Sequence, residues 1–265
     1  MTRVSDILNY MRKVGTWVDW DRTVDGVIVG SADTEVTDAA IAWIPSYEAL
    51  REAARMRCQL FITDEPTFYS HRGELEHAGE WPGAQEKKAF IEQCGLTILR
   101  NHDTWDNMPG VGIPWAWAAF LGIEGKPAAC RPYLHVYAIP ETTLGELARR
   151  IASRTAGIGE PTVQVAGDPA MQVSRVGIGT GCACDPRAYR EMGAQAGIVC
   201  DDGTSYWAHI QWALDHRFGI IRVNHATSEE PGVAAMARHL AEQFPQVQFH
   251  HIPQGCRFRL VWGKA

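Results

Sequence analysis

The sequence lacks the features that mark several large classes of protein. It has no apolar run of the roughly 18 residues that a helix needs to cross a bilayer. Residues 1–15 mix charged and apolar side chains at helical spacing, unlike a signal peptide. No basic run is present, and a formal net charge of −6 disfavours nucleic acid and anionic membranes as partners. We therefore expect a cytoplasmic protein with neither kind of partner.

The cysteines form no recognisable framework. There are seven of them, and only Cys182 and Cys184 lie close together, with no second pair to complete a zinc tetrahedron. We interpret most of them as small buried apolar residues, with a ligand or redox role for the close pair as the less favoured alternative. A glycine-rich phosphate loop is also missing.

What is present is a regular alternation of apolar strand-like runs and amphipathic helical runs. With 265 residues, of which 46% are hydrophobic, the chain can form one large or two medium domains. The alternation predicts an α/β fold with largely parallel sheets. We expect two layered α/β domains, at residues 1–126 and 127–265. The principal expected strands are 26–30, 59–63, 96–100, 133–139, 163–165, 173–178, 196–200, 219–223, 247–250 and 258–262, and the expected helices are 4–13, 46–57, 84–94, 114–121, 143–154, 186–192, 206–216 and 229–243.

Polar side chains that can bind metal follow three of the expected strands. Asp64 and Glu65 come directly after the run QLFIT. The stretch 101–106 (NHDTWD) follows LTILR, and the stretch 224–229 (NHATSE) follows GIIRV. Since ligands of open α/β sheets bind beyond the carboxyl ends of strands, these residues are candidates for one site.

The spacing within two of these stretches strengthens the case. His102 and Asp106, like His225 and Glu229, are four residues apart and would share one face of a helical turn. Each feature also has an ordinary structural explanation, because a lone His-x-x-x-Glu is commonly a surface pair and an acidic residue near a helix start favours the helix dipole. Three such strand ends together favour metal binding. The five side chains that would suffice for a two-metal cluster are Asp64, Glu65, Asp106, His225 and Glu229.

At these residues the sequence resembles the Nif3-like family, also called DUF34 and known as the GTP cyclohydrolase 1 type 2 family. The stretch 224–233 (NHATSEEPGV) is similar to the family's Gly-His-x-x-Thr-Glu-x-Pro-Gly-Val motif. The stretch 61–69 (FITDEPTFY) resembles its strand followed by His-His-Pro or His-Glu-Pro, and 101–106 resembles its His-Thr-x-Leu-Asp element. Gly167-Asp168-Pro169 also fits the family's middle.

The resemblance implies two α/β domains that face each other across a cleft with a dinuclear metal site, usually in a toroidal homohexamer. It implies the same five ligands, with His102 in or next to the coordination sphere. Where the family normally has histidine, this chain has Asp64. An added carboxylate favours Mn²⁺, Fe²⁺ or Mg²⁺ over zinc, since oxygen ligands suit those ions.

These observations lead to two hypotheses about function. The first is a hydrolase that uses one or two divalent ions (Mn, Fe or Zn) to activate water on a small-molecule substrate, as GTP-cyclohydrolase-like activity would require. His102 or His209 would carry protons in this reaction, although His209 fits a surface position equally well. The alternative is a metal-handling or regulatory protein without turnover, which the same ligands would serve.

Overall fold

The computed structural model describes residues 1–263 of the chain. The chain divides into two compact units, each built from two stretches of sequence. Unit 1 comprises Met1–Ala116 and Gly232–Pro253, and unit 2 comprises Trp117–Pro231 and Gln254–Ala265. This division differs from the expected single break near residue 126, because the chain returns to unit 1 after completing most of unit 2.

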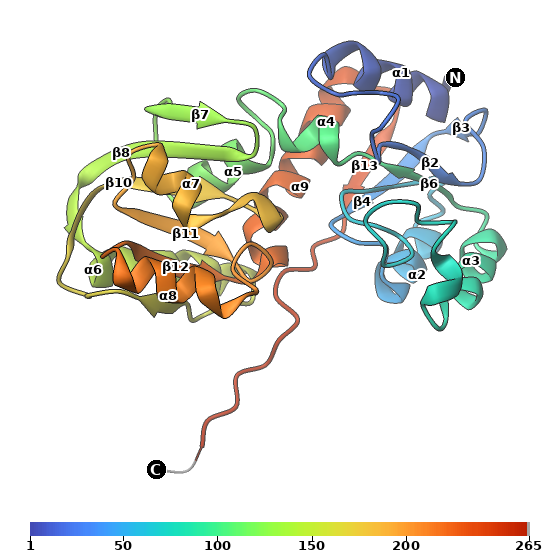
Figure 1. The fold of residues 1–265 in the computed structure, drawn as a ribbon. Helices are drawn as coiled ribbons and strands as arrows, with labels where there is room; N and C mark the ends of the chain where they lie inside the picture. Colours follow the sequence, from blue (N-terminus) through green and yellow to red (C-terminus); the bar gives the residue numbers. More distant parts are fainter. Residues whose placement is uncertain (264–265) are drawn as a thin grey trace. The chain divides into compact units, whose positions relative to one another are not determined.

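Unit 1 is built around a five-stranded sheet with the order β13-β4-β5-β6-β2 (Figure 1). Strands β13, β4, β5 and β6 run parallel to one another, and β2 is antiparallel to β6. A short antiparallel pair, β1 with β3, lies outside this sheet. The elements of this part of the chain are β1 (Thr2–Arg3), α1 (Val4–Val14), β2 (Gly26–Val29), β3 (Glu35–Val36), β4 (Asp38–Ala42), α2 (Tyr47–Arg55), β5 (Leu60–Thr63), α3 (Ala84–Gln93), β6 (Thr97–Arg100), α4 (Asp103–Asp106) and β13 (Gln248–His251).

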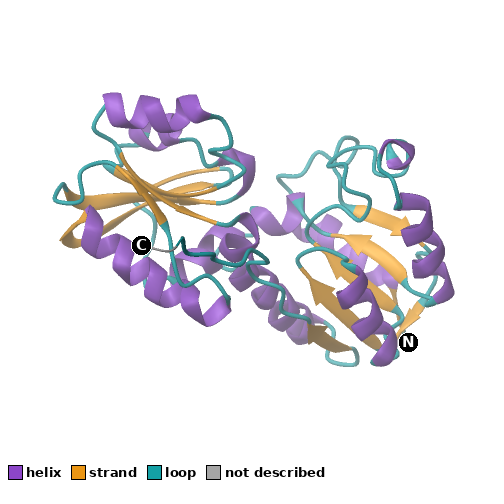
Figure 2. Ribbon diagram, turned by 90° about the horizontal axis from the view of Figure 1, so that it is seen from below, coloured by secondary structure: helices purple, strands orange, loops and turns teal. Residues whose placement is uncertain are grey.

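Apolar layers cover both faces of this sheet. Alternate strand residues such as Ile62 and Leu99 pack with α1, Trp105 and the second half of α9 (His225–Gln243). The intervening residues, such as Phe61 and Ile98, pack with α2 and α3. Figure 2 shows helices on both sides of the strands. Since both faces are buried, the strands are continuous apolar runs, as expected for a parallel sheet.

Unit 2 contains a six-stranded mixed sheet with the order β7-β8-β10-β11-β12-β9. Only β10, β11 and β12 run parallel, and the pairs β7-β8, β8-β10 and β12-β9 are antiparallel. The expectation of largely parallel sheets is therefore right for unit 1 and too simple for unit 2. The elements here are β7 (Ala129–Arg131), β8 (Leu134–Thr143), α6 (Leu144–Thr155), β9 (Gln164–Ala166), β10 (Gln172–Gly179), α7 (Pro186–Glu191), β11 (Ala196–Cys200), α8 (Trp207–Asp215) and β12 (Gly219–Val223).

The sheet of unit 2 also lies between two helical layers. Val176 and Ile178 face α6 and the residues of α5 (Ile113–Phe120) from Trp117 onward, whereas α7 and α8 cover the opposite face. On that second face the ring of Tyr189 lies directly against β10 at Gly177. A side chain at position 177 would occupy the space of this ring, so glycine is required there for packing.

Two helices continue from one unit into the other. They are α5 (Ile113–Phe120) and α9 (His225–Gln243). Helix α9 starts directly after β12 and contains Pro231 within its length. The proline ring removes one backbone donor from the helix at the point where the chain passes between the units.

The predicted α/β class is confirmed, and most predicted elements are present within a few residues of their expected ends. Ser46 and Thr143 cap α2 and α6 by accepting backbone N–H groups. Strand β4 was not predicted from the sequence. The strand predicted at 258–262 was wrong, since these residues form no strand and Phe258, Val261 and Trp262 are largely exposed. Among residues 1–263, no helix is long and apolar enough to span a membrane.

The close contact between Gly177 and Tyr189 leads to a stability prediction. A Cβ at position 177 would lie 2.3 Å from Cδ1 of the fully buried Tyr189 ring. We expect Gly177→Ala to lower the free energy of unfolding by about 2 kcal/mol, as overpacking does. Urea unfolding followed by circular dichroism measures this. Gly157→Ala is the control because nothing lies within 4 Å of its Cβ position, and equal effects of the two changes would contradict the prediction.

Lys87 of α3 leads to a second prediction, about pH. Its buried ammonium group donates to the Thr67 carbonyl at 2.6 Å and lies 4.5 Å from the centre of the Tyr69 ring. Burial lowers the pKa of Lys87 to about 8, while Glu74 opposes the shift. The unfolded chain, with a lysine pKa of about 10.4, therefore binds more protons between these two values, and stability rises with pH through that window.

The matched variant is Lys87→Met, which keeps the apolar stem without the charge. Between pH 7 and pH 10 we expect the wild-type protein to gain about 2 kcal/mol of unfolding free energy relative to this variant. Denaturant unfolding of both proteins at several pH values tests this, since other titrating groups affect both alike. If the difference in unfolding free energy between the two proteins does not change with pH, the Lys87 ammonium is not destabilised by burial.

Candidate metal centre

The first group of candidate ligands lies at the carboxyl ends of β5 and β6. These strands are parallel neighbours, and their pairing register aligns Thr63 with Arg100. The residues that follow, Asp64 on one strand and Asn101 on the other, therefore emerge at the same edge of the sheet. Asp64 is fully buried and Asp106 is nearly so. Buried carboxylates are costly unless a positive charge or hydrogen bonds compensate them.

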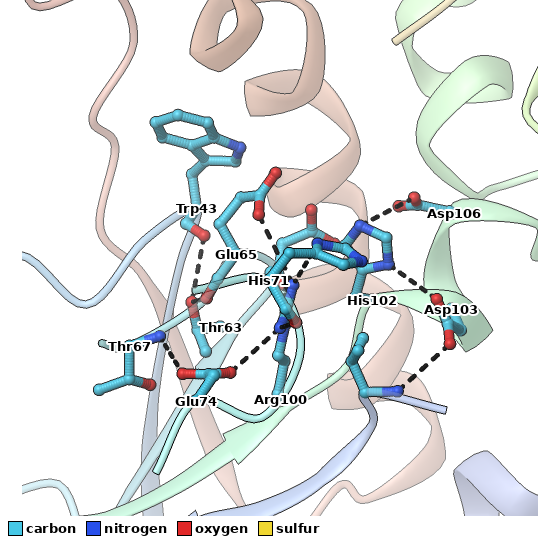
Figure 3. A network of polar contacts seen from close by, with 12 residues as sticks. Trp43, Thr63, Glu65, Thr67, His71, Glu74, Arg100, His102, Asp103 and Asp106 are labelled. Atoms are coloured by element: carbon cyan, nitrogen blue, oxygen red, sulfur yellow. Dashed lines mark hydrogen bonds and ion pairs between the residues drawn. The ribbon is translucent and has the colours of Figure 1, made fainter. Parts of the chain in front are cut away.

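A short helical turn, α4, presents His102 and Asp106 on one side. Asp25 holds the start of this turn, because its carboxylate accepts the backbone N–H groups of His102, Asp103 and Thr104 at 2.7–2.9 Å. With the turn fixed, His102 Nε2 lies 3.5 Å from Asp106 Oδ2, and His102 Nδ1 lies 3.0 Å from Asp103 Oδ1. The imidazole is thus oriented by a carboxylate on each side, as Figure 3 shows.

Asp64, His102 and Asp106 together form a potential cation site. One ligand atom from each lies within 4.8 Å of the others. Ligand atoms on one ion are about 3–4 Å apart when each bond is about 2.1 Å long, so small side-chain adjustments would place all three on one ion. Two carboxylates and one imidazole suit Mn²⁺, Fe²⁺ or Zn²⁺ by their chemistry.

The electrostatics of this group also favour a cation. Burial opposes a charge on His102, but Asp106 and the hydrogen bond to Asp103 overcome it and raise the pKa of His102 to about 9. The negative potential that stabilises an imidazolium there would likewise attract a metal ion. The donor set therefore fits a divalent cation on both geometry and charge.

Glu65 belongs to a neighbouring network centred on Arg100. The guanidinium of Arg100 is fully buried and lies 3.6 Å from Glu65 and 3.1 Å from Glu74. It also donates to the backbone carbonyls of Asp64 and His71, at 3.0 and 2.7 Å. These contacts hold the loop after β5 against the end of β6 (Figure 3).

His71, in the same loop, is a potential ligand that the sequence interpretation did not include. One ligand atom each of Glu65, His71 and His102 lies within 4.8 Å of the others, and the two imidazole rings are 5.0 Å apart. His71 is exposed at the surface, but desolvation of its ring by the surrounding loop, with the charges of His102 and Arg100, lowers the pKa of His71 to about 4. No motif pointed to this histidine, because only the folding of the loop brings it to the strand ends.

In unit 2, His225 and Glu229 occupy the first turn of α9, directly after β12. His225 Nε2 lies 2.9 Å from Glu229 Oε1, which confirms that the four-residue spacing places both on one face. Asp201, at the end of the adjacent strand β11, accepts the backbone N–H of His225 at 2.6 Å. The carboxylate of Asp202 lies 3.9 Å from His225 Nδ1.

The loop after β10 closes against this pair. Gly181 has a positive φ, and a Cβ there would lie 3.5 Å from His225 Nε2 and 3.8 Å from Glu229 Oε1. The two cysteines that are close in sequence differ in their surroundings. Cys182 is exposed, whereas buried Cys184 lies 3.6 Å from Cys200, Sγ to Sγ. Neither Cys184 nor Cys200 forms a disulfide.

His209 lies on α8 in unit 2 and is half-buried. Its ring contacts Tyr206, with 6.3 Å between the ring centres. A role for His209 in proton transfer stays a prediction, whereas the orientation of His102 between two carboxylates is observed. Asp25, Arg100 and Asp201 are the supporting residues that sequence reasoning missed.

Solved structures provide an independent comparison. A Staphylococcus aureus hypothetical protein, SA1388, superposes with a TM-score of 0.82 at 15% identity, covering 98% of this chain and 99% of its own. A Bacillus cereus protein related to NIF3 gives 0.80 at 12% identity, covering 98% and 99%. The protein ybgI, described as of unknown function, gives 0.77 at 20% identity, covering 96% and 100%. At these identities the likeness establishes the fold.

Curated proteins, by contrast, include no match to this sequence. The family described as Duf34/NIF3 (NGG1p interacting factor 3) matches residues 1–254. This match covers nearly the whole chain and includes the strand ends of both units. The chain therefore belongs to the DUF34/NIF3 family.

Proposed function

We propose that this protein is a divalent-metal-dependent hydrolase acting on a small-molecule substrate. The proposed ligands are Asp64, Glu65 and Asp106 from unit 1 with His225 and Glu229 from unit 2. The number of ions is one or two, and GTP-cyclohydrolase-like chemistry is the reaction that the family resemblance suggests. Membership of the DUF34/NIF3 family supports this assignment.

The observation that carries the proposal is the clustering of Asp64, His102 and Asp106. Three metal-competent side chains lie within 4.8 Å of one another, two of them buried carboxylates. These carboxylates lie at the carboxyl ends of two parallel strands, which is where ligands of α/β sheets bind. The His225–Glu229 pair offers a second group of metal donors in the corresponding place, after β12.

A bound divalent ion would supply Lewis acidity and lower the pKa of a water molecule. The residues of the chain provide the rest of the chemistry. While it is not bound to the ion, His102 can hold a proton at Nε2 facing Asp106, since Asp103 fixes the opposite side of its ring. Such an imidazole can pass a proton to a leaving group or receive one from water. His209 is the second proposed proton carrier.

The alternative is a metal-handling or regulatory protein without turnover. It would use the same ligands, and metal binding alone does not separate the two functions. We further propose a homohexamer, from the family resemblance, and a cytoplasmic location. Turnover by metal-loaded protein is the property that distinguishes the hydrolase.

The direct test is to remove metal from the protein, reload it with Mn²⁺, Fe²⁺ or Zn²⁺, and assay GTP, phosphoesters, amides and cyclic amidines. We expect turnover that needs added metal and falls by about 100-fold or more in Asp106→Ala and in His225→Ala, because each removes a ligand. His77→Ala is the control, since this exposed histidine forms an ion pair with Glu80 and is not one of the proposed ligands. Tight metal binding without turnover would favour the metal-handling alternative.

The presence of an aspartate at position 64 leads to a further prediction, about metal preference. Asp64→His would exchange an oxygen donor for an imidazole and should raise the affinity for Zn²⁺ relative to Mn²⁺, by about 10-fold, because imidazole suits zinc. Competition with a chromophoric chelator measures both affinities. Asp33→His, at an exposed surface position, controls for an added histidine. An unchanged zinc-to-manganese ratio would argue against Asp64 as a ligand.

A further inference from the structure

The buried guanidinium of Arg100 lies beside one of the two potential cation sites of unit 1. Arg100 Nη2 is 3.2 Å from Nδ1 of His71 and 3.6 Å from Oε2 of Glu65. It thus contacts two of the three side chains of the Glu65–His71–His102 group. By donor type alone, two imidazoles and one carboxylate would bind Zn²⁺ or Fe²⁺ well.

The position of Arg100 prevents that use. Arginine stays protonated in proteins, so its charge repels a divalent ion placed against the same donors. Arg100 can only donate, and His71 Nδ1 must therefore accept with its lone pair. A neutral imidazole that accepts at Nδ1 carries its proton on Nε2. Neither nitrogen of His71 then has a free lone pair for a metal ion.

Arg100 cannot readily move out of this position. Its side chain is fully buried, and its remaining donors bind the carbonyls of Asp64 and His71 and the carboxylate of Glu74. Glu74 is itself held by the backbone N–H groups of Thr67 and Phe68. The guanidinium is therefore part of the loop's own structure.

We propose that Arg100 takes the place of a cation at Glu65, His71 and His102, closing this group to divalent metal. Unit 1 then offers metal one position, Asp64–His102–Asp106, and Arg100 acts as a positioning residue that orients Glu65. This inference rests on the proposed metal-dependent function. It adds that Arg100 limits the number of ions that unit 1 can bind. It also adds that removing the Arg100 charge would make this group available to metal.

The experiment counts metal ions per chain by elemental analysis after equilibration with Zn²⁺ and removal of free ion. The variant is Arg100→Gln combined with Glu74→Gln, which removes both charges together and leaves an amide to donate to the loop carbonyls. The single lone pair of His102 serves the Asp64–His102–Asp106 position, so Glu65 and His71, completed by water, would hold an added ion. We expect this double variant to bind one more ion per chain than the wild-type protein. Adding His71→Ala to it should return the count to the wild-type value.

Two controls separate charge from structure. Arg100→Lys keeps the positive charge and should leave the count unchanged. Arg72→Gln removes an exposed guanidinium from the same loop, where it donates to the carbonyl of Arg22, and should also leave the count unchanged. A double variant that folds, as judged by circular dichroism, and binds the wild-type number of ions would overturn the proposal.

Single changes in the wild-type background give an independent measurement that does not depend on replacing a buried residue. We expect His71→Ala to leave the metal count and affinity unchanged, whereas His102→Ala should lower the count. Loss of an ion in His71→Ala would show that His71 is already a ligand and that Arg100 does not close the group. Wild-type protein that binds no divalent ion at all would instead contradict the proposed function. Failure of the Arg100 inference shows only in how the metal counts of the variants compare with that of the wild-type protein, so the two failures are distinguishable.

Discussion

Negative charge buried at the carboxyl ends of β5 and β6 is the constraint on which the organisation of unit 1 depends. Asp64, Glu74 and Asp106 are all buried or nearly so, and carboxylates removed from water need compensating partners. Arg100 provides one fixed positive charge, and His102, with its raised pKa, provides a second. The loop after β5, the α4 turn and the end of β6 are all arranged around this balance.

In both units a histidine and a carboxylate are positioned by the same local structure. In each, a strand ends and a helical turn begins, with the histidine four residues before the acidic side chain. In each, an aspartate accepts the backbone N–H of that histidine, Asp25 for His102 and Asp201 for His225. A carboxylate bonded there fixes the start of the turn and favours the helix dipole. The donors are thus held in place before any ion binds, and preorganised ligands bind metal more tightly.

Much of this arrangement follows from local pattern. Apolar runs with buried faces predicted most strands, and the caps at Ser46 and Thr143 predicted helix starts that the structure contains. The failures have physical causes. The mostly apolar run at 258–262 (FRLVW) is typical of a strand, but a strand needs a neighbour to hydrogen-bond, and these residues form no strand in the structure. The order and direction of the strands in unit 2 depend on long-range pairing that local pattern does not contain.

The sequence by itself determined the α/β class, the candidate donors at strand ends and the shared face of His225 and Glu229, because these depend on period and spacing within a few residues. Only the tertiary structure decided that Asp64, His102 and Asp106 lie together, since this requires two parallel strands in a particular register. It also placed His71 and the charge of Arg100 beside them. Contacts between residues about thirty positions apart form only when the chain folds, because the burial of apolar faces, and not local preference, selects them.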